Sequence, residues 1–259
     1  MLVFRREFLG LRSLQVWWPG NAGSVRALLG DAPTITVMQS SDVIADELAE
    51  YVFRRRQFNT ILIDLARTHE ELLQDLSRAC RYQINRARRL QPRITVNTHQ
   101  AVSRALVDGT ARRLGYRPKL HDSEWSQATG RGDVFIVWLD EEPIATRVTL
   151  VDGSHRARLL YSATTDRSDE RLRPMISPLN RWLHWFEFGY YKERDVRYYD
   201  FGGVDLDPAS PLYSITQFKA SFGGEVVCEN LLRLARQPQL RAMLRLLGDN
   251  KDRWARASR

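Results

Sequence analysis

The sequence predicts an α+β protein in which a mostly antiparallel mixed central sheet is flanked by helices. Three observations lead to this class. A capping box opens a long helical run at residue 68, the segment 133–163 alternates apolar and polar residues between tight turns, and an aromatic helix then precedes a strand that is followed by two glycines. With 259 residues, the chain is long enough for one large domain or two small ones.

The first elements follow from local patterns. The stretch 58–66, FNTILIDLA, is expected to be a strand. Thr68 and Glu71 have the spacing of a capping box, so a helix should begin there and run to about Leu90. Five residues with 3.6-residue spacing give this helix an apolar face: Leu73, Leu76, Cys80, Ile84 and Ala87.

The other side of this helix is basic. It carries Arg78, Arg81, Arg88 and Arg89, and residues 78–93 include no acidic residue. A solvated helix face normally mixes charges and so gains pairs between residues four apart. The arginine face therefore indicates phosphate binding, with simple solvation as the alternative.

The remaining elements complete a sheet. A short strand at 93–99 and a helix over about 100–115 are followed by strands at 133–139, 143–151 and 155–163. Their turns include Asp152-Gly153, a strong hairpin signal, so these three strands should form an antiparallel meander. Ser177 and Pro178 resemble an N-cap and first helical position, and that helix should end near Lys192. Strands are expected at 196–201 and 225–235.

Composition limits the classes of partner and cofactor. The net charge of +8 favours a polyanionic partner, such as nucleic acid, anionic lipid or a phosphorylated substrate; the alternative is charge that serves solubility alone. The five histidines are scattered and the two cysteines lie far apart, so no metal site is expected. The N-terminus lacks the apolar run of a signal peptide and no stretch is apolar enough to span a membrane, so we expect a cytoplasmic protein.

The order of the elements resembles the GNAT acyltransferase fold. Within it, an ordered set of segments over residues 60–230 resembles the FemABX-type group: LIDLARTHEELLQDLSRACRYQINRARR, YSATTD, YYDFGGVD and FKASFGG. This group consists of aminoacyltransferases that move an amino acid from aminoacyl-tRNA to the amine of a peptidoglycan precursor. The resemblance implies amide-bond formation on the amine of a cell-wall precursor or small peptide. It implies aminoacyl-tRNA as donor, a peptide or lipid-linked amine as acceptor, and no cofactor.

Two alternatives stay open. GNAT enzymes that use acetyl-CoA carry a Gln/Arg-x-x-Gly-x-Gly/Ala loop after the third meander strand, where backbone N–H groups hold the pyrophosphate. The corresponding segment here, 164–183, has no glycine. An N-acyltransferase that uses acyl-CoA or an acyl-carrier thioester is therefore the less favoured alternative. A non-enzymatic nucleic-acid-binding module is a third, supported by charge and the arginine face alone.

The resemblance also implies catalytic residues. Lys219 stands where the family places its Phe-Lys pair, and we expect it to contact the terminal phosphate of the donor or the developing oxyanion; the alternative is a lysine that snorkels from the edge of the core. Asp200 is expected to orient the acceptor amine, or else to cap the following glycines in an Asx-type turn. Tyr199 is expected to line the same groove, unless it is a core residue.

Substrate-binding residues are expected on three segments. Phe218 and Phe222 are expected to stack on a terminal adenine or to exclude water. Tyr161 is expected to line the groove, although strand aromatics are commonly core residues. Arg78, Arg81 and Arg88 would contact phosphates of tRNA or of the acceptor.

We expect three parts in the chain. Residues 1–60 correspond to a truncated first GNAT-like half or an N-terminal extension, and residues 61–235 to the GNAT-like acyltransferase domain. Residues 236–259 form a basic helix or tail, which is either docked on the protein or in peripheral contact with an anionic membrane.

Overall fold

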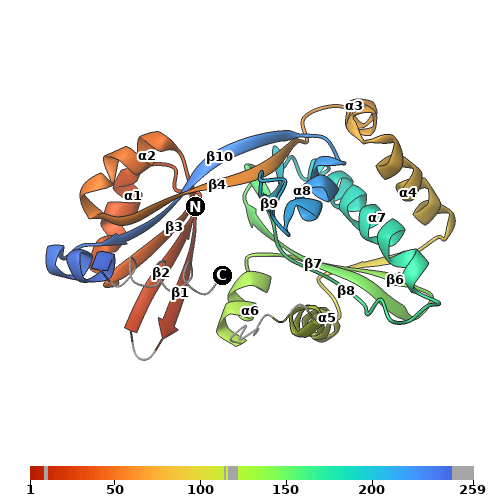
Figure 1. Ribbon diagram of the computed structural model, residues 1–259, viewed down its shortest axis with the longest axis horizontal. Coiled ribbons are helices and arrows are strands. Elements are labelled where there is room, and N and C mark those ends of the chain that lie inside the picture. Colours follow the sequence, from red (N-terminus) through yellow and green to blue (C-terminus); the bar gives the residue numbers. More distant parts are fainter. Residues whose placement is uncertain (9–10, 114, 116–121, 247–259) are drawn as a thin grey trace. The chain divides into compact units, whose positions relative to one another are not determined.

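A computed structural model describes residues 1–8, 11–113, 115 and 122–246 (Figure 1). The described residues form two compact units: the first consists of residues 1–59 together with residues 228–246, and the second of residues 60–227. Two strands, β4 (Val52–Asp64) and β10 (Glu225–Ala235), cross the boundaries between the units in the sequence.

The first unit is built on a small mixed sheet with strand order β1-β2-β3-β10. Strands β1 (Leu2–Phe8) and β2 (Leu11–Trp17) form an antiparallel hairpin. Strand β3 (Thr34–Ser40) is parallel to β2 and antiparallel to β10. Helices α1 (Ala22–Ala27) and α2 (Asp42–Glu47) and two 3₁₀ turns, Leu28–Gly30 and Ala49–Tyr51, complete this unit, and apolar side chains from its strands and helices share one core.

The second unit contains the predicted meander. Its strand order is β4-β9-β8-β7-β6-β5, with β5 (Arg93–Val96), β6 (Gly132–Leu139), β7 (Glu142–Asp152), β8 (Arg156–Thr164) and β9 (Tyr198–Gly203). Neighbouring strands are antiparallel except β8 and β9, which are parallel. The α+β class with a mostly antiparallel mixed sheet is therefore confirmed.

Helices cover both faces of this sheet (Figure 1). Helix α7 (Arg173–Lys192) packs on β6 and β7, and α4 (Arg78–Arg89) packs on α7. Helices α5 (Gln100–Arg113) and α6 (Asp122–Thr129) pack on the opposite face of the same strands. The two remaining helices described in this unit are α3 (His69–Asp75) and α8 (Tyr213–Ala220).

The predicted helix 68–90 is two helices. The capping box at Thr68 is present, since its side chain accepts from Glu71 N and the Glu71 carboxylate accepts from Thr68 N. The helix ends at Leu76, whose backbone is extended, and Ser77 caps a new helix by accepting from Cys80 N. A serine side chain competes for backbone N–H groups and favours such a cap, so the apolar spacing alone was misleading here.

The aromatic helix begins earlier than predicted. Helix α7 starts at Arg173 with Pro174 in its first turn, and Pro178 lies inside the helix and is buried. The first-turn proline lacks a donor that would have no intrahelical partner anyway, which favours this start. Ser177 is therefore not the N-cap. The predicted end near Lys192 and the strand at 225–235 are confirmed.

Only part of the predicted basic tail is described. Residues 238–246 are helical, and residues 247–259 lie outside the described residues, as does most of the predicted membrane-contacting segment. No helix in the described part of the chain is long and apolar enough to cross a membrane.

Candidate functional site

The second unit contains a cavity where two parallel strands separate. Strands β8 and β9 pair from Arg156 and Tyr198 as far as Arg158 and Asp200. Beyond that point the carboxyl ends of both strands line a cavity of about 550 Å³, together with residues of α7 and α8. Ligands commonly bind at the carboxyl ends of parallel strands where neighbouring strands diverge, so this cavity is the candidate site.

The cavity is positively charged. Among the described residues, three cationic side chains line it, those of Arg158, Arg167 and Lys219, and no aspartate or glutamate does. Apolar walls come from leucines of β8 and from Phe201, Ile215 and Phe218. A low-dielectric cavity with unbalanced positive charge favours an anionic ligand or a developing negative charge.

Hydrogen bonds hold the Lys219 side chain at the carboxyl end of β9. Helix α8 is anchored at Thr216, whose side chain hydroxyl donates to Asp205 O and accepts from Asp205 N. The Lys219 Nζ then donates to Gly203 O (2.6 Å) and Gly202 O (3.3 Å). Burial, with Arg158 nearby, lowers the pKa of Lys219 to about 8, although Asp200 opposes that shift. At neutral pH this lysine is therefore mainly charged.

Asp200 lies beneath the cavity rather than in it. Its side chain is fully buried and pairs with Arg156 (2.9 Å) and Arg158 (3.7 Å). Its other oxygen accepts from Gly202 N (2.7 Å) and from the Thr60 hydroxyl. The hydrogen bond from Gly202 N forms the Asx-type turn that was one of the two roles considered for Asp200. The carboxylate also positions Arg158 at the cavity wall.

Gly202 meets a backbone requirement at this turn. Its φ is +71°, and a Cβ there would come within 3.1 Å of Leu159 O on the neighbouring strand. A side chain would therefore press against the strand that forms the other wall of the cavity.

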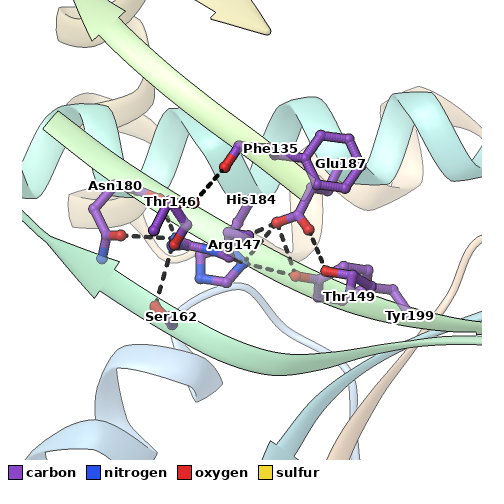
Figure 2. Close-up of polar contacts among 9 residues, drawn as sticks. All are labelled: Phe135, Thr146, Arg147, Thr149, Ser162, Asn180, His184, Glu187 and Tyr199. Carbon is purple, nitrogen blue, oxygen red and sulfur yellow. Dashed lines mark hydrogen bonds and ion pairs between the residues drawn. The ribbon is translucent and has the colours of Figure 1, made fainter. Parts of the chain in front are cut away.

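A buried polar network stands behind the cavity (Figure 2). The Arg147 side chain on β7 is fully buried. It donates to the Asn180 side chain (2.7 Å), to Ser162 Oγ (3.1 Å) and to His184 Nδ1 (3.4 Å). Asn180, Ser162 and His184 all line the cavity. Arg147 thus fixes three polar groups that a ligand would meet.

Glu187 balances this arginine. Its carboxylate lies 3.4 Å from Arg147 Nε and accepts from the hydroxyls of Thr149 (2.7 Å) and Tyr199 (3.0 Å). Burial raises the pKa of Glu187 to about 7, and Arg147 limits that rise. A fully buried ion pair is costly unless its hydrogen bonds are satisfied, and these contacts supply them.

His184 lines the cavity and is uncharged at neutral pH. Burial, followed by Arg147, Lys219 and Arg181, lowers its pKa well below 6.5. Its Nδ1 lies 3.4 Å from Arg147 Nε and 3.0 Å from the Tyr199 hydroxyl, so the ring is held in place by the buried network. The pKa effect of Lys219 on His184 agrees with their common position on the cavity wall.

The predicted aromatic residues occupy different positions. Phe218 lines the cavity, with the Arg181 guanidinium 4.5 Å from its ring centre. Phe222 is 1% exposed and packs in the core, and Tyr199 is fully buried with its hydroxyl 3.0 Å from His184 Nδ1. Tyr161 alternates with Leu160 and Ser162 along β8, so it points to the other face and stacks on Trp125 of α6. Of these four, the structure brings only Phe218 to the cavity.

The predicted arginines lie on α4 and do not line the cavity. Arg78 and Arg88 are exposed. Arg81 is half-buried and donates to Gln74 O (3.3 Å) and Leu76 O (3.2 Å), so it satisfies carbonyl groups at the end of α3. Arg81 therefore has a structural role at the junction of the two helices.

The sequence reading missed the network around Arg147. One signal was available: an arginine in the middle of the apolar strand 143–151. A second was the spacing of Asn180, His184 and Glu187, which places three polar groups on one face of α7. Within the described part of the chain, no group of three or more His, Cys, Asp or Glu side chains could hold a metal ion.

Comparisons with known proteins support the fold. No protein-family model and no curated protein matches this sequence. Among solved structures, FemX matches with a TM-score of 0.68 at 13% identity, over 94% of this chain and 86% of that one. L-PGS from Bacillus licheniformis matches with a TM-score of 0.57 at 12% identity, over 94% and 84%.

A third solved structure matches with the same TM-score as L-PGS. The C-terminal domain of a proposed lysylphosphatidylglycerol synthetase from Agrobacterium fabrum matches with a TM-score of 0.57 at 14% identity, over 93% of this chain and 82% of that domain. The resemblance to the FemABX-type group that the sequence motifs indicated is thus confirmed at the level of the fold.

Proposed function

We propose that this protein is an aminoacyltransferase that takes an amino acid from aminoacyl-tRNA and forms an amide bond on the amine of a cell-wall precursor or small peptide. The observation that carries the proposal is Lys219, whose ammonium group lies in a positively charged cavity at the diverging ends of β8 and β9. The fold shared with FemX supports the same class of reaction.

The reaction requires stabilisation of a developing anion. A neutral acceptor amine attacks the ester carbonyl, so an N–C bond forms and the carbonyl oxygen becomes negative. Collapse of this intermediate breaks the ester C–O bond, and the ribose hydroxyl leaves with a proton that the amine has lost. Groups aimed at the oxyanion accelerate such a step most when they are fixed in advance and shielded from water.

Lys219 and Arg158 meet this requirement. An ammonium group has three protons, and Lys219 directs two hydrogen bonds to the carbonyls of Gly202 and Gly203. The remaining proton is available for a phosphate or oxyanion in the cavity. Arg158 lines the same cavity and is positioned by Asp200, so both cations are fixed by the protein rather than by the ligand.

His184, Asn180 and Ser162 add polar groups to the cavity wall. All three are held by Arg147 and line the cavity. We assign them to orientation of the acyl donor, because their side chains are fixed by a buried network.

The loop before α7 argues against coenzyme A as donor. In acetyl-CoA-dependent relatives of this fold, backbone N–H groups of that loop bind the pyrophosphate. Here the Asp169 carboxylate accepts from Arg171 N (2.9 Å) and Leu172 N (3.3 Å), and Pro174 has no N–H. These backbone N–H groups already donate to Asp169, so they are not free to bind a pyrophosphate. This favours an acyl donor other than coenzyme A.

The proposal is tested with two donor pools. The protein is incubated with tRNA charged with mixed amino acids, or with acyl-CoA, in the presence of candidate amines, and amide products are measured with and without ribonuclease. We expect products from charged tRNA alone, and a ribonuclease that cuts within the 3′-terminal CCA sequence should abolish them. Ribonuclease-insensitive transfer from acyl-CoA would reject the proposal. Equal binding of charged and uncharged tRNA without transfer to any amine would favour a nucleic-acid-binding module.

A matched pair of lysine variants tests the site. Lys219→Ala should lower the transfer rate about 100-fold, the size of effect expected when an oxyanion-stabilising group is lost. Lys192 is the control, because its Nζ also donates to two carbonyls, Leu65 O (2.9 Å) and Arg67 O (2.6 Å), and it does not line the cavity. Lys192→Ala should retain transfer. Full activity in a folded Lys219→Ala variant would exclude Lys219 from the site.

A further inference from the structure

Helix α4 has a basic exposed face that the reaction in the cavity does not use. Five of its twelve residues are arginines and none is acidic. Cys80, Ile84 and Ala87 are buried in the core. Opposite them, helical spacing aligns four residues on one stripe: Arg78, Tyr82, Asn85 and Arg89.

The positive charges of this face are not paired with carboxylates of the described residues. Arg78, Arg88 and Arg89 are exposed, and the described part of the chain brings no carboxylate within ion-pair distance of them. Two other arginines of the same unit that are at least partly exposed do have carboxylate partners, Arg67 with Asp75 and Arg197 with Asp64. Like charges close together on a helix destabilise it slightly, so folding alone does not account for this face.

The basic face begins beside the candidate site. Ser77 N, at the start of α4, donates to Ser221 O (2.9 Å), only two residues after Lys219. Arg181 of α7 lies over the ring of Phe218, a cavity residue. From Arg78 to Arg89 the helix then extends about 16 Å. A ligand that places its reactive end in the cavity thus has a basic surface available next to it.

The chemistry of the face favours RNA over a lipid bilayer. A helix that binds a membrane surface inserts an apolar face, and the apolar face of α4 is buried in the core. The large ring on its exposed side is Tyr82, which is 65% exposed. Arginine side chains beside an exposed aromatic ring suit phosphate contacts and base stacking.

We propose that the exposed face of α4, with Arg78, Tyr82, Arg88 and Arg89, binds the body of the donor RNA outside its acylated end. This inference rests on the proposed function for the identity of the RNA. It assigns to the face a contact with the polyphosphate backbone that does not depend on the amino acid carried.

Binding of uncharged tRNA tests the surface without any chemistry. The variant is Arg78→Gln/Arg89→Gln, and the control is Arg112→Gln/Arg113→Gln, which removes two charges from α5 on the opposite face of the sheet. The first pair should weaken binding about tenfold and reduce the slope of log affinity against log salt by about 2, since each lost phosphate contact changes it by about 1. The control should bind like the parent protein. Equal affinity and slope in both variants would overturn the proposal.

A second comparison separates this inference from the proposed reaction. Transfer is measured from intact charged tRNA and from the aminoacylated 3′-terminal fragments that a guanosine-specific ribonuclease releases from the same pool. The α4 variant should lose about tenfold in kcat/KM with intact tRNA and less than about twofold with fragments. Equal losses with both donors would refute the surface, whereas no transfer from either donor in the parent protein would refute the proposed function alone.

Vesicle binding checks the competing partner. The α4 variant and the control are mixed with vesicles that contain about one third phosphatidylglycerol. If the α4 variant lost vesicle binding and kept the parent affinity for tRNA, the face would bind membranes and the proposal would be wrong. Circular dichroism and thermal unfolding confirm that both variants are folded.

Tyr82→Ala should weaken tRNA binding several-fold without changing the salt slope, because it removes stacking and no charge.

Discussion

Replacement of Lys219 by methionine should stabilise the folded protein at neutral pH while it lowers the rate of transfer. The pKa of Lys219 falls from an ordinary 10.5 to about 8 because burial disfavours the ammonium form. The difference corresponds to about 3 kcal/mol, since each pKa unit is about 1.4 kcal/mol. Methionine has no charge to bury. It does lose the two hydrogen bonds to Gly202 and Gly203, worth about 1 kcal/mol each. The net expectation at pH 7 is a gain of about 1 kcal/mol.

The sign of this effect changes with pH. Because the folded-state pKa of Lys219 is the lower one, the unfolded chain binds more protons between pH 8 and 10.5, and the stability of the parent protein rises with pH in that window relative to the variant. The cost of burying the charge falls to about 2 kcal/mol at pH 9 and to about 1 kcal/mol at pH 10. The methionine variant should therefore be the more stable protein at pH 7 and the less stable one at pH 10.

Urea unfolding at pH 7, 8, 9 and 10 measures the difference in unfolding free energy between parent and variant. Lys192→Met, which loses two similar hydrogen bonds away from the cavity, is the control. A difference between Lys219→Met and the parent that does not vary with pH would refute the reasoning. So would a loss of several kcal/mol at pH 7, which would mean that Lys219 serves the fold rather than the site.

Three further changes test the supporting structure. Burial raises the pKa of Glu187 to about 7, so the folded state binds more protons than the unfolded state between pH 4.5 and 7. The free energy of unfolding therefore falls as pH rises through that window. Glu187→Gln should flatten this part of the stability profile, measured by thermal unfolding. Arg147→Met should lower the unfolding free energy by about 3 to 5 kcal/mol, because it leaves a buried carboxylate unpaired; a smaller loss than that of Glu187→Gln in urea unfolding would contradict the assignment. Gly224→Ala should cost at least about 2 kcal/mol, since its φ is +86° and a Cβ would lie 2.5 Å from Leu62 O; a change below 0.5 kcal/mol by the same measurement (about the scatter of surface substitutions) would show that the chain relaxes there.

The sheet was predictable because its signals are local. The turn at Asp152-Gly153 and the alternation on either side specify the β7–β8 hairpin within about twenty residues. The capping box at Thr68 is equally local and marks the start of α3 correctly. Helix boundaries that depend on distant partners were less accessible. The break at Ser77 is completed by Ser221, which lies 144 positions further along the sequence and cannot be inferred from helical spacing.

The site was predictable only in part for the same reason. Lys219 and Phe218 were identified through a family position, and both line the cavity. The polar groups around Arg147 come from strands and a helix separated by up to 52 positions, from 147 to 199, and their meeting depends on how α7 lies on β7. The position of Tyr161 follows from the alternation of side chains along a strand. Once Ser162 faces the cavity, its neighbour Tyr161 must face the other side of the sheet.

The charge arrangement also suggests why the site has no carboxylate to act as a base. Arg156 and Arg158 both pair with Asp200, and the described residues that line the cavity include three cationic side chains and no aspartate or glutamate. A positive cavity stabilises an oxyanion and, by the same interaction, lowers the pKa of any ammonium group that enters. An acceptor amine would therefore lose its proton to water more readily on binding, and would be present as the neutral nucleophile. A glutamate on the cavity wall would reverse both effects. Glu187 is buried, is balanced by Arg147 and does not line the cavity, so its negative charge is kept away from the reacting atoms.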